Sequence, residues 1–194
     1  MTSPTDMPNI IAAMRKCCEI SDETLTDICK VMERKDFAKR QLLVEEGCRK
    51  GMAFFIEEGM TRSYWVVDGA EVTTSFSTAG AIVFSMDEVY YDKLSEEFVE
   101  TIDASTCYAI SLPTLKRLIN DNIELARWWS VIHQNEYRRL HRSHKERLTL
   151  AAPERYAMFR ECFPEVCRRA RLCDIASYLG ITLSTLSRIR RGKG

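Results

Sequence analysis

The segment from about residue 40 to residue 110 constrains the fold more than any other part of the chain. Runs such as MAFFIEEGMTRSYWVV and EVTTSFSTAGAIVF are rich in β-branched and aromatic residues, which is typical of β-strands. Between two such runs, Asp68-Gly69 predicts a hairpin turn. Short strands separated by turn residues favour a sandwich, barrel or jelly roll over a parallel sheet.

Helical patterns flank this strand-rich segment. Apolar residues recur at helix-like intervals between residues 9 and 36. The helical pattern returns from 111 to about 143, with Pro113 suited to a first turn, and again from 153 to about 162. Strands enclosed by helices in this order indicate the α+β fold class.

The helical segment that follows the strands predicts a dimer. Leu118, Leu125 and Ile132 are seven residues apart, the spacing of a helix that packs against a long partner. The adjacent Trp128 and Trp129 favour a second copy of the chain as that partner. The predicted seam consists of Leu118, Leu125, Trp128, Trp129 and Ile132. The alternative is a helix that lies on its own domain.

The stretch DIASYLGITLSTLSRIRR, residues 174–191, predicts two short helices joined by a tight turn. Ile175 and Leu179 belong to one apolar face of the first helix, and Gly180 permits the turn. The hydroxyl of Thr182 can cap the second helix. The segment therefore has the pattern of a helix-turn-helix.

The second of these helices has an apolar and a polar side. Leu183, Leu186 and Ile189 fall within one third of the circumference, which predicts that they pack. Arginines on the other side can pair bidentately with a guanine edge, and hydroxyl groups can hold phosphates. The predicted DNA contacts are Thr182, Leu183, Ser184, Thr185, Ser187, Arg188, Arg190 and Arg191.

Charge is unevenly distributed, although the whole chain has a formal net charge of zero. From Arg138 onward there are 14 Lys and Arg against 5 Asp and Glu, whereas residues 1–137 hold 14 against 23. The basic end favours double-stranded DNA as a partner. A dimer would then read a palindromic operator with half-sites about 34 Å apart. Cations at a helix C-terminus are also favourable without DNA, so an ordinary helical hairpin is the alternative.

Three motifs, LLVEEG, FFIEEGMTRSYWVVDGAEVTTSF and IASYLGITLSTLSRIRR, together resemble the Crp/Fnr superfamily of transcription regulators, in the short form of Bacteroides-type bacteria. The resemblance implies a cyclic-nucleotide-binding-like jelly roll (double-stranded β-helix) with flanking helices over residues 1–112. A long dimerisation helix would span 113–147, and a winged-helix-like DNA-binding domain 148–194. It further implies a homodimer that senses an effector in the roll and contacts RNA polymerase.

Two departures from that superfamily change the expectations. Phe84-Ser85 stands where a Gly-Glu opens the phosphate cassette, and Ser95-Glu96 stands where an Arg-Ser closes it. Without a cationic partner, carboxylates beside a buried anion are unfavourable, so cyclic AMP is not the expected effector. The degenerate cassette comprises Phe84, Ser85, Met86, Ser95, Glu96 and Glu97. On the reading helix, only Arg188 keeps an expected base-contacting residue type.

Other classes of function find little support. No nucleophile elbow, phosphate loop or paired-carboxylate constellation is present, so no enzyme is expected. Irregularly spaced cysteines predict reduced thiols without a metal or cofactor, and Cys162, Cys167 and Cys173 leave a thiol switch as a minor alternative. The polar start and the lack of a long apolar run predict a cytoplasmic protein away from membranes. The rival hypothesis is an interaction module that no longer reads DNA.

Overall fold

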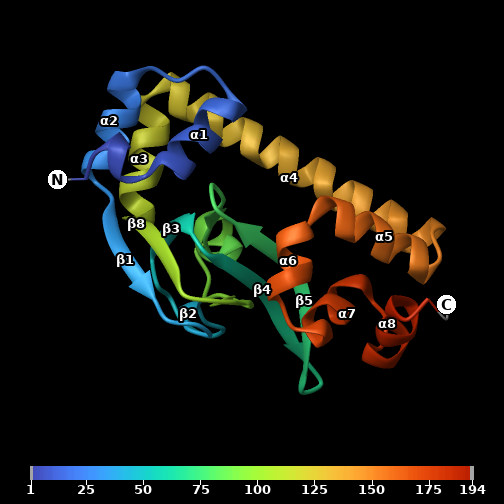
Figure 1. The fold of residues 1–194 in the computed structure, drawn as a ribbon. Helices are drawn as coiled ribbons and strands as arrows, with labels where there is room; N and C mark the ends of the chain where they lie inside the picture. Colours follow the sequence, from blue (N-terminus) through green and yellow to red (C-terminus); the bar gives the residue numbers. More distant parts are fainter. Residues whose placement is uncertain (1, 193–194) are drawn as a thin grey trace.

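A computed structural model describes residues 2–192 and contains two four-stranded antiparallel sheets arranged as a jelly roll (Figure 1). The first sheet has the order β1 (Glu33–Phe37), β8 (Ser105–Ser111), β3 (Met52–Glu58), β6 (Ile82–Val83). The second has the order β2 (Leu42–Val44), β7 (Phe98–Thr101), β4 (Met60–Val67), β5 (Ala70–Thr78). The antiparallel α+β expectation is confirmed, and the first strand begins earlier than residue 40.

The β4–β5 hairpin turns where the sequence predicts it. Val67 pairs with Ala70, so the loop contains only Asp68 and Gly69. Both residues are left-handed, with φ values of 51° and 77°. Two consecutive positive φ angles define the type I′ turn, whose twist matches that of the strands it joins.

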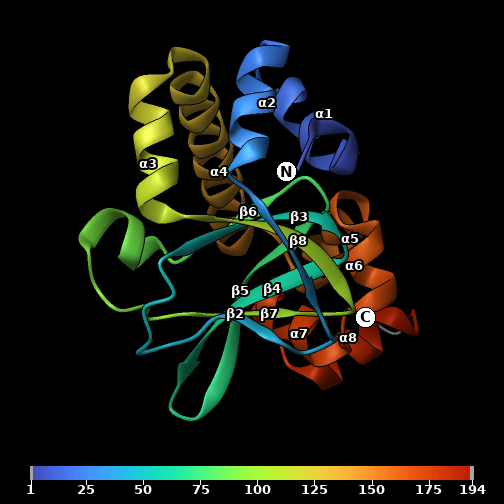
Figure 2. The same cartoon turned by 90° about the vertical axis from the view of Figure 1, so that its left-hand side faces the viewer.

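The N-terminal helices cover one end of the roll (Figure 2). They are η1 (Pro4–Asp6), α1 (Pro8–Cys17) and α2 (Asp22–Lys30), and α1 and α2 share a core with β3 and β8. The carboxylate of Glu57 accepts hydrogen bonds from the N–H groups of Asn9 and Ile10 at 2.9 and 3.0 Å. This buried carboxylate satisfies free N–H groups at the start of α1, where negative charge is favourable.

The expected continuous helix over 113–147 is wrong, because the chain forms α3 (Leu112–Asp121) and α4 (Ile123–Thr149). Asn122 is extended, with φ −128° and ψ 116°, and its side-chain oxygen accepts from the N–H groups of Glu124 and Leu125. An asparagine cap of this kind starts a new helix. The long helix therefore begins after the break and continues beyond the expected end.

The C-terminal helices pack on the second sheet. They are α5 (Ala152–Cys162), α6 (Pro164–Arg169), α7 (Leu172–Leu179) and α8 (Leu183–Arg190). Met60, Phe76 and Ile102 of the roll join these helices in one apolar core. In Figure 1, α4 extends from the N-terminal helices towards these C-terminal helices. The roll and the C-terminal helices are therefore held together by packing as well as by the chain.

Candidate nucleic-acid interface

The turn between α7 and α8 has the expected local structure. Gly180 is left-handed, with φ 65° and ψ 38°, a conformation that costs a glycine little. Thr182 then caps α8, its hydroxyl oxygen accepting from the N–H of Thr185 at 3.1 Å. Thr182 also lies within 2.9 Å of the Ser184 hydroxyl oxygen. Polar groups therefore gather at the exposed start of α8.

The two sides of α8 differ in burial. Leu186 is fully buried against α7, and Ile189 packs beside it. The expectation that Leu183 packs with them is wrong, because its side chain is 48% exposed. It lies instead on the exposed side of the helix with Ser184 and Arg188. Position 183 is thus available for a contact with a partner.

The remaining predicted contacts fall into two groups. Thr185 and Ser187 are half-buried, whereas Thr182, Arg190 and Arg191 are exposed. Burial raises the pKa of the Cys167 thiol in α6, and the charges of Arg160 and Arg190 partly offset that effect. Arg190 therefore lies near α6, at the edge of the packed side of α8. The structure does not bring it onto the same face as Arg188.

The basic charge of the C-terminal segment is only partly free. The arginines of the CRRARL run form ion pairs within the chain: Arg168 with Glu165, Arg169 with Asp103, and Arg171 with Asp174. In contrast, no carboxylate in residues 2–192 pairs with Arg188, Arg190 or Arg191. Free cationic charge is thus present on and beside α8, whereas Arg169 and Arg171 of CRRARL join the C-terminal helices to carboxylates of the roll.

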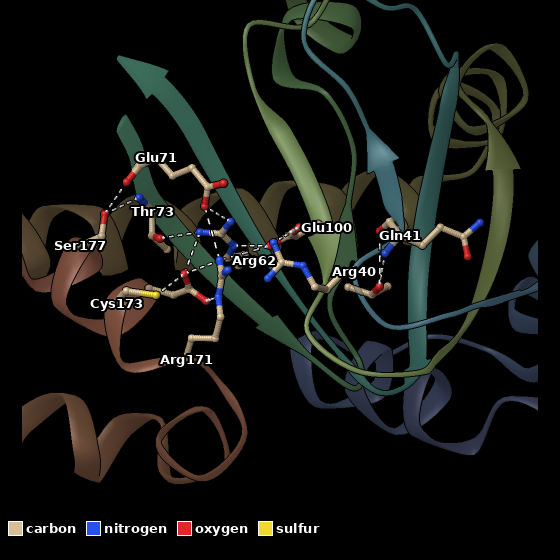
Figure 3. A network of polar contacts seen from close by, with 11 residues as sticks. Arg40, Gln41, Arg62, Glu71, Thr73, Glu100, Arg171, Cys173 and Ser177 are labelled. Carbon is tan, nitrogen blue, oxygen red and sulfur yellow. Dashed lines mark hydrogen bonds and ion pairs between the residues drawn. The ribbon is translucent and has the colours of Figure 1, made fainter. Parts of the chain in front are cut away.

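A buried ion cluster docks α7 on the roll (Figure 3). The guanidinium of Arg62 on β4 is 1% exposed and donates to Glu100 of β7 at 2.6 Å and to Asp174 of α7 at 3.0 Å. It also pairs with Glu71 of β5, while Arg171 binds both oxygens of Asp174 at 2.8 Å. Three carboxylates therefore surround one buried cation.

A serine of α7 binds the backbone of the edge strand β5. The N–H of Thr73 donates to the hydroxyl of Ser177 at 2.9 Å, and that hydroxyl donates to the carbonyl oxygen of Glu71 at 3.0 Å. Because β5 ends the second sheet, these backbone groups would otherwise lack a strand partner. The ion cluster and the serine together set the position of the α7–α8 pair relative to the roll.

The predicted dimer seam is only partly available. Leu118 lies on α3 and is therefore out of line with the seam of α4. Leu125 and Trp128 are buried in the chain's own core, where Trp128 stacks on Phe55 with ring centroids 5.8 Å apart. Placing these residues in the seam was wrong, because the first turns of α4 lie on the roll's core. The partly buried Trp129 and Ile132 pack against that core as well.

A different stripe of α4 is exposed. Tyr137, Leu140 and Leu148 are large apolar residues that are at least half exposed, and His144 lies between the last two. Their separations of three, four and four residues place them on one side of the helix. The sequence contains this spacing, but the adjacent tryptophans led to a predicted seam on a neighbouring side of the helix. The stripe is an unpartnered apolar surface within the described residues.

The degenerate cassette encloses the short helix η2 (Asp87–Tyr91). Ser85 and Ser95 are buried, and each hydroxyl accepts a hydrogen bond from a nearby N–H group. Burial raises the pKa of Glu97 to about 7, an effect that the N–H of Met86 reduces and Asp87 reinforces. Glu96 is exposed, and Phe84 stacks on Trp129 at 5.5 Å. The two ends of the cassette therefore meet at a partly buried carboxyl group.

Within residues 2–192, no three His, Cys, Asp or Glu side chains are grouped to hold a metal ion. Across the same residues, no helix combines the length and apolarity needed to cross a membrane.

The sequence did not single out Arg62 or Glu100 of the buried ion cluster. The signal available for them was a pair of opposite charges within strand-like runs.

The fold resembles solved structures, whereas no protein-family model and no curated protein matches the sequence. FixK2 from Bradyrhizobium japonicum is similar with a TM-score of 0.69 and 22% identity over 84% of each chain. The c-di-GMP responsive global regulator CLP from Xanthomonas campestris matches 89% of this chain and 91% of its own, with a TM-score of 0.68 and 14% identity. A cyclic nucleotide-binding domain from Methylobacillus flagellatus matches 78% of this chain and 89% of its own, with a TM-score of 0.64 and 18% identity.

Proposed function

We propose that this protein is a homodimeric, sequence-specific DNA-binding transcription regulator of Crp/Fnr type. The observation that carries the proposal is the division of charge in the C-terminal helices. Three arginines of CRRARL form ion pairs with carboxylates of the same chain, whereas Arg188 in α8 and Arg191 directly after it are exposed and pair with no carboxylate of the described residues. Unneutralised arginines on a capped, exposed helix after a tight turn suit contact with base edges and phosphates.

The similar structures support this function through the fold. The match to CLP covers 89% of the chain, more than residues 1–149 could supply, so it includes part of α5–α8. CLP is described as linking cell-cell signalling to gene expression. A shared arrangement of roll and C-terminal helices in a regulator is consistent with a DNA-reading role for α7 and α8.

Dimerisation would occur through the exposed stripe of α4 that contains Tyr137, Leu140 and Leu148. Self-association along one helix buries these side chains and relates two copies of α8 by a two-fold axis. Such a dimer would bind a palindrome whose half-sites lie about one helical turn apart.

The roll would serve as the sensor, without cyclic AMP as its usual ligand. A phosphate placed at the cassette would meet the carboxyl groups of Glu96 and Glu97, and none of the six cassette residues is a cation that could pair with it. Burying an anion beside carboxyl groups without a cationic partner is unfavourable. The effector of the roll would therefore differ in chemistry from a cyclic nucleotide.

Selection of bound fragments from a random duplex pool tests the proposal. The parent protein should enrich a palindrome, and Arg188→Ala should relax or abolish that preference. Arg168→Ala is the matched control, because it removes the same charge from an arginine that is paired with Glu165. On the enriched duplex, Arg188→Ala should weaken binding by about 1–3 kcal/mol. Equal enrichment by the parent and Arg188→Ala would contradict a reading role for α8 and favour the interaction module.

A further inference from the structure

A cavity of about 290 Å³ lies between the C-terminal half of α4, α5 and α7. It is separate from the cassette of the roll and from the exposed side of α8. Its volume lies near the lower end of the range for ligand sites, about 300–1,000 Å³. The cavity is therefore large enough for a small organic molecule.

The wall formed by α4 and α5 is strongly basic. Its cationic residues are Arg138, Arg139, Arg142, Arg147 and Arg155, and Glu146 is the one acidic residue of the lining. Among the described residues, only Arg139 of these five arginines pairs with a carboxylate, that of Glu136. The Nε of Arg155 is buried without a hydrogen-bond partner in the same part of the chain. A buried donor without an acceptor is unfavourable unless a ligand or water completes it.

The floor of the cavity is apolar. Its side chains come from α5, the residue after it and α7, and they comprise Met158, Phe159, Phe163, Tyr178 and Leu179. We propose that this cavity binds a small organic anion, with an apolar or aromatic body on the floor and a carboxylate or phosphate group at the arginines. Arginine matches both anionic groups through paired N–H donors.

A second copy of the chain would leave this cavity open. Each residue of an α-helix advances by about 100°, so Asn135, Arg139 and Arg142 lie on the side of α4 opposite Tyr137 and Leu140. The exposed stripe and most of the α4 wall of the cavity thus use different faces of the helix, and Arg147 is the cavity arginine that lies on the Leu140 side. The DNA backbone is also a poor match, because its phosphates would leave the apolar floor without a partner.

The bound anion would contact both α4 and the group of C-terminal helices to which α8 belongs. Arg139 donates to the hydroxyl of Tyr178 at 3.2 Å, and Arg147 donates to the Tyr178 carbonyl oxygen at 2.8 Å. An anion that binds either arginine would change how α4 holds α7. Regulation of DNA affinity by this ligand rests on the proposed function, whereas binding of the ligand does not.

The first experiment measures binding of 8-anilinonaphthalene-1-sulfonate, an aromatic anion, to the full chain by fluorescence. Arg138→Ala combined with Arg142→Ala removes two exposed arginines of the wall and should weaken binding at least about tenfold. Arg127→Ala, on an exposed part of the same helix outside the cavity, should leave it unchanged. The uncharged analogue N-phenyl-1-naphthylamine should bind both forms equally. Equal sulfonate affinity of the parent and the double variant would overturn the proposal.

The second experiment locates the probe through thiol protection. Cys162 lines the cavity and Cys173 does not, although both are exposed. The sulfonate should slow alkylation of Cys162 by iodoacetamide about tenfold at 90% occupancy, with Cys173 unaffected. Unchanged labelling of Cys162 at saturating probe would refute this location. Protection of Cys162 by duplex DNA, lost in the double variant, would instead assign the arginines to the DNA interface.

Discussion

Replacing Arg62 with methionine should destabilise the whole protein, because it removes the buried cation that joins the roll to α7. The side chain of methionine preserves part of the apolar stem but none of the donors. Glu100 is then left buried, and the remaining cations near it among residues 2–192 are Arg40 and Arg171, each 3.9 Å away. A buried carboxylate that loses its closest cation is strongly unfavourable.

The contacts of Arg62 set the size of the effect. It donates at 2.6 Å to Glu100 and at 3.0 Å to Asp174, and a hydrogen bond to a charged group contributes about 1.5–3 kcal/mol. The full value does not apply at Asp174, because Arg171 continues to bind both of its oxygens. The side chain of Glu71 is 44% exposed, so its ion pair with Arg62 contributes less. We therefore expect a loss of about 3–5 kcal/mol, the range for breaking a buried ion pair.

Urea unfolding followed by circular dichroism measures this loss. With a slope of about 3 kcal/mol per M, the midpoint should fall by roughly 1 to 1.7 M. Arg40→Met is the matched control, because Arg40 approaches the same Glu100 from a position that is 47% exposed. Such a surface pair contributes about 0–1 kcal/mol, so its midpoint should shift by less than about 0.3 M. Equal shifts for the two variants would refute a central role for the buried cation.

Three further outcomes follow from particular contacts. Ser177→Ala should cost about 1–3 kcal/mol in urea unfolding, because it leaves the buried N–H of Thr73 without its acceptor; Ser184→Ala, on the exposed side of α8, should change little. Burial raises the pKa of Glu97 from 4.5 to about 7, so the folded state holds a proton that the unfolded state loses. The free energy of unfolding should therefore fall as the pH rises from about 4.5 to 7, and Glu97→Gln should flatten that decline. A pH profile of stability that Glu97→Gln leaves unchanged would contradict this role of Glu97. Leu140→Asp should shift a dimer to monomer in sedimentation, whereas an unchanged mass would place the dimer contact elsewhere.

Features that depend on neighbouring residues were predictable from the sequence. The Asp68-Gly69 hairpin is decided by the backbone conformations that these two residues tolerate. The turn at Gly180 and the cap at Thr182 are equally local. The break at Asn122 also had a local signal, since asparagine is a favoured cap, but the heptad spacing concealed it.

The dimer seam shows where local pattern was insufficient. Trp128 and Trp129 lie on adjacent positions of one helix, and periodicity alone does not tell which surface covers them. The roll supplies that surface by stacking Phe55 on Trp128 and Phe84 on Trp129. The exposed stripe could be identified only after these contacts had removed the tryptophans from consideration.

The sequence by itself determined the strand-rich centre, the capped helices and the polar face of α8, because hydrophobic period and backbone preference act over a few residues. Only the tertiary structure decided which charges are free. Arg62 and Asp174 are 112 positions apart, and their ion pair depends on packing of α7 against the second sheet. The same packing brings Glu71 and Glu100 of the roll beside Arg171, whereas Arg188 stays exposed. Local sequence does not distinguish these arginines, because a charge is paired or free according to what the fold brings beside it.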